Sequence, residues 1–242
     1  MSQLVKLLRS AGRVTSRPTA GFGSRQEGAR KRLVLVGVLD GMDAAAAKKA
    51  IEAGADALEV VAEHGDKALD QLKKVIDAVS APVGVSFAES IPLDFDFKRL
   101  DQVGIDYIKV EAGEVPATVF LIENAAVVLE VKESFSDTML KMLNFLPAKA
   151  VQVDSPEDVQ GFTVKRLMEA RVDRELIAKP LLMKVGEAIK PEAAQLLALI
   201  APNGLVVPAG DVAAWQQALA NLKEPPEEEG GLSISLRAPS AA

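Results

Sequence analysis

Residues 102–113 read QVGIDYIKVEAG, and their pattern recurs along the chain. The pattern predicts the end of a helix, a tight turn and then a strand. Side chains alternate along a strand, so Tyr107, Lys109 and Glu111 share one face, and the residues between them are apolar. One face of this strand is therefore apolar, while the other carries a lysine and a carboxylate.

The same frame recurs along the chain. Aligned on the strand, the position of Lys109 is taken by other residues in three further segments: Glu59 in 52–63, Gln152 in 148–154 and Val206 in 203–210. In the second of these segments Asp154 falls level with Glu111. These segments are every second strand of a repeating strand–helix pattern.

The repeat contains eight strand–helix units. The expected strands are 33–39, 56–62, 82–88, 105–111, 125–132, 148–153, 180–185 and 204–208. The expected helices are 43–53, 66–79, 97–103, 116–122, 137–145, 163–176, 190–200 and 212–222. Strands that alternate with helices favour βαβ units and a parallel sheet. Eight units predict an α/β fold closed into a (β/α)8 TIM barrel over 33–223, with an open doubly wound sheet as the alternative.

The composition excludes several kinds of site. The chain has 242 residues and no cysteine, which rules out disulfides, Fe–S clusters and cysteine nucleophiles. Its single histidine, His64, cannot build a histidine-based metal site. The net charge of −6 leaves the body without a nucleic-acid footprint. No apolar run approaches the roughly 18 residues that span a bilayer, so we expect a cytoplasmic protein without a transmembrane segment.

Both ends of the chain differ from the barrel. Residues 1–32 form a basic N-terminal helix and arm, expected to pack on the N-terminal end of the barrel; an organellar presequence or a patch for anionic membrane or RNA is the alternative. Residues 224–242 read as an acidic, Gly-containing linker and a disordered tail. The segment LSISLR in this tail resembles the Gly-linked C-terminal peptides that dock cargo proteins inside encapsulin shells. It could therefore dock a partner protein.

A barrel builds its active site at the C-terminal ends of its strands. If the apolar faces point towards the helices, the side chains that point into the barrel are polar with one exception, Val38. They are Val38, Asp40, Glu59, Glu63, Ser86, Lys109, Glu111, Glu130, Lys132, Gln152, Asp154 and Lys184. The facing of 82–88 stays open, because Val83, Val85 and Phe87 fit either side. Burying several charges is costly unless they are paired, and paired charges in a cleft shift pKa values for catalysis.

The lysines are the expected catalytic groups. One of Lys109, Lys132 or Lys184 would be a Schiff-base nucleophile or a general base, its pKa lowered by burial and by the other lysines. Glu59 or Glu111 would carry the proton. The alternative is a mutually satisfied charge network that lines a polar barrel mouth.

A second group of residues is expected to bind the substrate: Asp40, Lys184, Gln152, Gly186 and Gly210. The two glycines follow the seventh and eighth strands, where many barrels hold a phosphate, and Lys184 would supply the countercharge. Asp40 and Asp154 would orient the reactive lysine or hold Mg²⁺.

The segment AIEAGADALEVVAEHGDKAL (50–69) is similar to the second βα unit of aldolase-type and phosphate-binding barrels. The resemblance is to 2-keto-3-deoxy-6-phosphogluconate aldolase, in which a strand with Leu-Glu-Val presents a glutamate like Glu59. The family's Schiff-base lysine lies on strand six, where this chain has Gln152. LMKVG (182–186) resembles deoxyribose-phosphate aldolase, whose strand-six lysine is likewise absent here.

These patterns predict a small-molecule lyase or isomerase of the aldolase-like type. It would act on a small anionic carbonyl compound by lysine and carboxylate catalysis, without a redox cofactor. One alternative is a Mg²⁺-dependent barrel with Asp40, Glu111 and Asp154 as ligands. Another is a catalytically silent barrel that serves as a binding or assembly module. The chain could also form a homo-oligomer.

Overall fold

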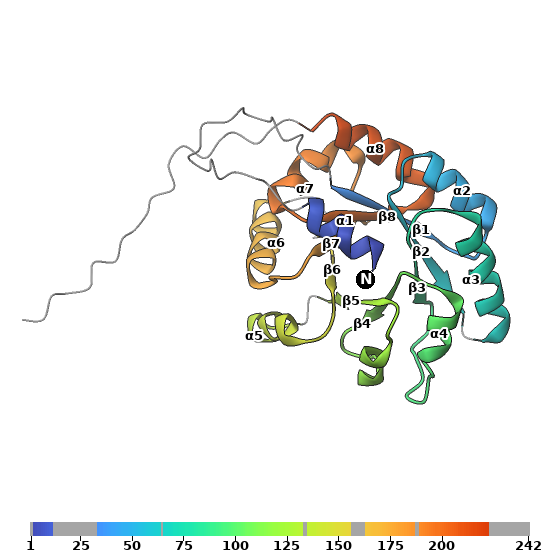
Figure 1. The fold of residues 1–242 in the computed structure, drawn as a ribbon. Coiled ribbons are helices and arrows are strands. Elements are labelled where there is room, and N and C mark those ends of the chain that lie inside the picture. Colours follow the sequence, from blue (N-terminus) through green and yellow to red (C-terminus); the bar gives the residue numbers. More distant parts are fainter. Residues whose placement is uncertain are drawn as a thin grey trace, which may run out of the picture.

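A computed structural model describes residues 2–11, 33–63, 65–132, 135–155, 163–186 and 189–222. The chain in these ranges forms a closed barrel of eight parallel strands in sequential order, surrounded by helices (Figure 1). The expectations for His64, the arm at 12–32 and the tail at 224–242 concern residues outside the described ranges. No helix in the described part of the chain is both long and apolar enough to cross a membrane.

All eight predicted strands are present. They are β1 (Val34–Leu39), β2 (Ala57–Ala62), β3 (Val83–Phe87), β4 (Tyr107–Glu111), β5 (Ala126–Val131), β6 (Ala150–Asp154), β7 (Leu181–Lys184) and β8 (Gly204–Pro208). The barrel closes where β1 pairs in parallel with β8, with Val36 opposite Val206. This pairing confirms the TIM barrel, and the open-sheet alternative is wrong.

Helices connect the strands on the outside of the barrel. The α-helices there are α2 (Ala44–Glu52), α3 (Asp66–Ala78), α4 (Lys98–Val103), α5 (Asp137–Met142), α6 (Val164–Leu176), α7 (Ala194–Ile200) and α8 (Val212–Ala220). Four 3-10 segments accompany them: η1 (Ala117–Leu121), η2 (Leu143–Phe145), η3 (Pro191–Ala193) and η4 (Ala209–Asp211). The helix predicted over 116–122 is only η1, because the segment is short and its β-branched Thr118 and Val119 disfavour a helix.

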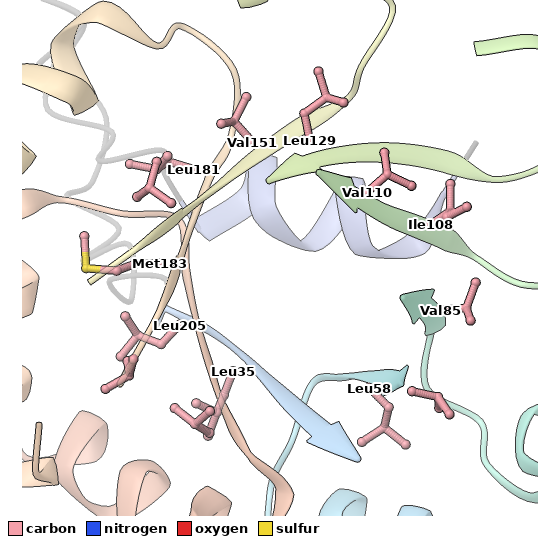
Figure 2. Packing of buried hydrophobic residues seen from close by; sticks show 14 of the residues in the cluster. Leu35, Leu58, Val85, Ile108, Val110, Leu129, Val151, Leu181, Met183 and Leu205 are labelled. Atoms are coloured by element: carbon pink, nitrogen blue, oxygen red, sulfur yellow. The ribbon is translucent and has the colours of Figure 1, made fainter. Parts of the chain in front are cut away.

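The strands separate their side chains into an outer and an inner layer. The outer layer is apolar and packs under the helices; Figure 2 shows labelled members such as Leu58, Ile108 and Leu129 pointing away from the barrel interior. On β3 the outward residues include Val83 and Val85. The facing that the sequence left open is thereby resolved. The predicted inward parity holds for the members within the strands, whereas Asp40, Glu63 and Lys132 lie exposed beyond the ends of β1, β2 and β5.

Helix α1 (Gln3–Ala11) lies across the N-terminal end of the barrel and closes the interior there (Figure 1). The apolar face of α1 buries Leu4, Val5 and Leu8 against inward residues of the strands. The basic face of this amphipathic helix is left outside. The interior at this end is therefore a packed apolar core.

The carboxylate of Asp106, the residue before β4, holds α1 in place. Asp106 accepts hydrogen bonds from the Ser2 hydroxyl at 2.7 Å, the Gln3 N–H at 2.6 Å and the Leu4 N–H at 2.9 Å. At the other end of the helix, the Asn203 amide donates to the Leu8 carbonyl at 3.1 Å. Asp106 thus satisfies donors that a helix N-terminus leaves unpaired, across 100 residues of sequence.

Substituting Asp106→Ala should release α1 from the barrel. The three lost hydrogen bonds to a charged acceptor predict a decrease of about 1–3 kcal/mol in the free energy of unfolding. Amide hydrogen exchange over residues 3–11 should accelerate in the variant. Asp43→Ala removes a cap from α2 and serves as the matched control, because it should leave exchange in α1 unchanged. Unchanged protection of α1 in Asp106→Ala contradicts this account of how the helix is held.

Candidate functional site

The barrel interior is charged at the C-terminal ends of the strands, and Lys109 lies at the centre of these charges. Its ammonium group is 3.2 Å from Glu59 Oε1 on β2 and 3.0 Å from Glu130 Oε2 on β5. The side chains of Lys109, Glu59 and Glu130 are 14%, 4% and 12% exposed, so the three charges are largely withdrawn from water. One buried cation therefore bridges two buried carboxylates.

Two neutral side chains hold the carboxylates from the sides. The Ser86 hydroxyl on β3 donates to Glu59 Oε1 at 2.8 Å. The Gln152 amide on β6 donates to Glu130 Oε1 at 3.3 Å. The carbonyl oxygen of Gln152 is buried and has no hydrogen-bond partner among the described residues. The network therefore runs from β3 to β6 and ends in an unused acceptor.

The floor below this network is aromatic. Tyr107 precedes Lys109 by two residues on the same face of β4 and is 1% exposed. Its hydroxyl donates to the Leu58 carbonyl at 2.9 Å, and its ring lies against Gly84, where an added Cβ would come within 2.2 Å of it. Burial, with the charges of Glu59 and Asp106, raises the pKa of Tyr107 well above its ordinary value. Tyr107 is thus a neutral floor between the apolar core and the charged network.

The carboxylates determine the charge of Lys109. Burial by itself lowers the pKa of an amine, but the attraction of Glu59 and Glu130 outweighs it, so the pKa of Lys109 lies above the ordinary lysine value. The pKa of the exposed Lys132 is raised too, chiefly by its hydrogen bond to Glu111. The lowered pKa that the sequence suggested is therefore wrong for both lysines, since each has its own carboxylate.

Two further ion pairs lie at the rim of the barrel mouth. Lys132 is 2.6 Å from Glu111, and Lys184 is 4.0 Å from Asp154. All four side chains are more exposed than the central trio. Burial raises the pKa of Asp154, although Lys184 opposes the shift. The three lysines are thus distributed over separate pairs instead of forming one cationic cluster.

Two of the cavities formed by the described residues open at the mouth of the barrel, and a third, about 290 Å³, lies beside Lys132 and Asp154 under α5 and α6. The larger of the two at the mouth, about 510 Å³, is lined by Val38, Asp40, Asp154, Ser155, Lys184, Val185, Gly186, Val206, Val207 and Pro208. The smaller, about 150 Å³, is lined chiefly by polar residues that include Ser86, Lys109, Glu111 and Glu130. The larger cavity has the size of a small-molecule pocket, and the smaller one borders Lys109 and Glu130 of the charged network.

The two glycines expected to bind the substrate differ in position. Gly186 lines the larger cavity, but its N–H donates to the Ser155 hydroxyl at 3.0 Å. Gly210 lies exposed in η4 and is not among the residues that line either cavity. Of the pair, only Gly186 therefore faces the space at the barrel mouth.

The expected Mg²⁺ ligands do not converge. Asp40 and Asp154 line the larger cavity, whereas Glu111 lines the smaller one and is paired with Lys132. Among the described residues, no three acidic or imidazole side chains form a group that could hold a metal ion. The carboxylates of this site are therefore arranged to pair with lysines.

One functional side chain was missed as a catalytic candidate. Glu130 was placed inside the barrel by the alternation along β5, but its contact with Lys109 was not foreseen. Glu130 lines the smaller cavity, whereas Glu59 does not. The signal that could have found it is the pairing of Glu111 with Glu130 in adjacent strands, which places acids side by side next to the lysine.

The comparisons with known proteins describe the fold. No protein-family model matches the chain, and no curated protein matches it. Solved structures do match. Tryptophan synthase subunit alpha from Legionella pneumophila str. Paris has a TM-score of 0.64 at 14% identity, with 92% of this chain and 100% of that chain covered.

Two enzymes from Pyrococcus furiosus match as well. Thiamine phosphate pyrophosphorylase has a TM-score of 0.59 at 14% identity, over 78% of this chain and 96% of that chain. N-(5'-phosphoribosyl)anthranilate isomerase has a TM-score of 0.59 at 15% identity, over 78% of this chain and 100% of that chain. The fold is a TIM barrel. At these identities the likeness concerns the fold alone.

Substituting Lys109→Met should destabilise the protein strongly, because it leaves Glu59 and Glu130 buried without a cation. Breaking a buried ion pair in this way predicts a loss of about 3–5 kcal/mol in the free energy of unfolding, measured by urea denaturation. Lys73→Met on the exposed face of α3 is the matched control and should change stability by less than about 0.5 kcal/mol. Equal effects of the two substitutions would show that the buried trio does not stabilise the fold.

Proposed function

We propose that the protein is an isomerase or lyase that moves a proton beside the carbonyl group of a small anionic compound. The observation that carries the proposal is the Lys109 ammonium held between Glu59 and Glu130 at the mouth of the barrel. A TIM barrel places its chemistry at this end of its strands. A barrel filled only for stability would use branched apolar residues at these inward positions.

Lys109 acts as a charged hydrogen-bond donor in this proposal. A Schiff-base nucleophile must be a neutral amine, whereas the two carboxylates raise the pKa of Lys109. A fixed ammonium group can instead bind a carbonyl oxygen and stabilise the negative charge that develops on it when a neighbouring C–H bond breaks. Lys109 is already oriented for this role, so little reorganisation is needed.

Glu130 acts as the base. It lines the smaller cavity and is held from both sides by Lys109 and Gln152, which fixes its position. Glu59 is more deeply buried and holds Lys109 from behind with the help of Ser86. Glu130 takes the proton from carbon, and the C–H electron pair becomes the enolate double bond. The carbonyl π pair moves onto the oxygen beside Lys109. In an isomerase acting on an α-hydroxy carbonyl compound, a proton passes from the hydroxyl oxygen to this oxygen, the new carbonyl forms, and Glu130 returns its proton to the former carbonyl carbon. In a lyase the carbonyl re-forms, and a leaving group on the next carbon departs with its bonding electron pair.

The exposed rim supplies the binding groups. Lys184 lines the larger cavity, and its ammonium group is 4.0 Å from the Asp154 carboxylate. At this distance the ion pair is loose, so an anionic group of the substrate can replace Asp154 as the partner of Lys184. Gln152 is 1% exposed and is not among the residues that line either cavity, so its role is to hold Glu130 and not to bind the substrate. Two of the similar structures carry phosphate or phosphoribosyl in their names, which favours a phosphorylated anion. Asp154, with its raised pKa, is a second proton carrier beside Lys184.

A second candidate is a barrel without chemistry that serves as a binding or assembly module. It is favoured by one observation: each lysine of the mouth is already paired with a carboxylate. In that case the network only stabilises the fold. Substitutions within it would then change stability without changing any ligand binding.

Proton exchange with solvent tests the proposal before the natural substrate is known. A panel of small keto and aldehyde acids, with and without a phosphate group, is incubated with the protein in D₂O. Loss of the proton beside the carbonyl is followed by ¹H NMR. We expect exchange with at least one compound, and a decrease of roughly 10²–10⁴-fold in Glu130→Gln, which removes the base.

Glu52→Gln on the exposed surface of α2 is the matched control and should exchange at the wild-type rate. Borohydride trapping of the same mixtures, read by peptide mass, should add no mass to Lys109. Absence of exchange across the panel, or wild-type exchange in Glu130→Gln, rejects the proton-transfer mechanism. A trapped adduct on Lys109 replaces it with Schiff-base chemistry.

A further inference from the structure

A separate cavity of about 420 Å³ lies at the opposite end of the barrel from the charged mouth. It is formed where β6, β7 and β8 begin, beside the C-terminal half of α1. Its lining residues are Arg9, Leu146, Pro147, Ala148, Lys149, Arg174, Ala178, Lys179, Pro180 and Asn203. Tyr107 and the apolar face of α1 lie between this cavity and Lys109. It is therefore not part of the proposed active site.

The charged residues that line this cavity are all cationic. Four of its lining residues, Arg9, Lys149, Arg174 and Lys179, are cationic, and none is acidic. No described carboxylate forms an ion pair with any of the four. The concentration of positive charge contrasts with the net charge of −6 of the whole chain. Such a concave cationic site attracts small anions.

Two of the cations are fixed in place by backbone carbonyls. Lys179 Nζ donates to the Leu146 carbonyl at 2.9 Å. Arg174 donates from Nε to the Ala201 carbonyl at 3.1 Å and from Nη1 to the Ile177 carbonyl at 2.8 Å. These neutral acceptors orient the two side chains but do not balance their charges. Both groups keep further N–H donors for a ligand.

In the absence of an anion, the positive charges that line the cavity repel one another. Burial lowers the pKa of Lys179, and the positive charges of Lys149 and Arg9 lower it further. Burial likewise lowers the pKa of Arg174; the nearby Glu175 carboxylate opposes this shift, and the charge of Arg171 adds to it. An anion in the cavity would relieve this repulsion.

We propose that this cavity binds a free small molecule through a phosphate or diphosphate group, at a site distinct from the active site. Arg9 belongs to α1, whereas Lys149 directly precedes β6, Arg174 belongs to α6 and Lys179 lies just before β7. A bound anion therefore connects α1 to the barrel wall. Because it binds only the folded arrangement, it stabilises the closed N-terminal end of the barrel.

Isothermal titration calorimetry with pyrophosphate tests this site, with ionic strength held constant by KCl. We expect wild-type protein to bind pyrophosphate. The Arg9→Gln/Lys149→Gln double variant should bind at least roughly tenfold more weakly, since each substitution removes a charged hydrogen-bond donor. Neither side chain makes a hydrogen bond or ion pair with a described residue, and circular dichroism checks that the variant is folded.

Two controls separate this site from its alternatives. Lys73→Gln/Lys74→Gln on the exposed face of α3 removes the same charge and should bind as wild type does. Lys184→Gln at the barrel mouth removes only pyrophosphate binding at the mouth, and it should retain the binding event that the Arg9/Lys149 variant loses.

Three results overturn the proposal. The first is no binding, or equal binding by the wild type and the Arg9/Lys149 variant. The second is loss of binding in Lys184→Gln alone, which assigns the anion to the mouth. The third is binding only after residues 224–242 are deleted, which makes the chain's own acidic segment the occupant.

Discussion

The structure depends on one buried ammonium group between two buried carboxylates. Each of the three charges is costly to bury by itself, and their pairing offsets that cost. The trio can form only if β2, β4 and β5 present Glu59, Lys109 and Glu130 at one level inside a closed barrel. Strand β3 lies between β2 and β4, and its inward residues are the small Gly84 and Ser86. Their size lets Lys109 reach across to Glu59.

The two ends of the barrel interior differ in polarity. At the N-terminal end, α1 and the inward apolar residues form a core of their own, separated by the strands from the layer under the outer helices. At the C-terminal end the same strands carry charges and line cavities. Tyr107 forms the boundary between the two halves. An apolar core thus fills one end of the barrel interior, and paired charges and cavities occupy the other.

Much of this arrangement follows from alternation along the strands. The pattern in 102–113 correctly predicted which face of β4 is polar, and the repeat predicted the number of strands. The partners of each charge did not follow, because they depend on register between strands distant in sequence. The direction of the lysine pKa was mistaken for that reason: burial was visible in the sequence, whereas the two carboxylates facing Lys109 were not. The 3-10 geometry of η1 reflects short-range chain effects that hydrophobic periodicity does not report.

The most direct test of the account is the pKa of Lys109 itself. It can be measured by NMR titration of protein labelled with ¹³C at lysine Cε, with the Lys109 signal assigned by its absence in the Lys109→Met variant. The account predicts a pKa above the ordinary lysine value, since Glu59 and Glu130 stabilise the charged form. A pKa below that value would contradict it, because the surroundings of Lys109 would then favour the neutral amine over the cation.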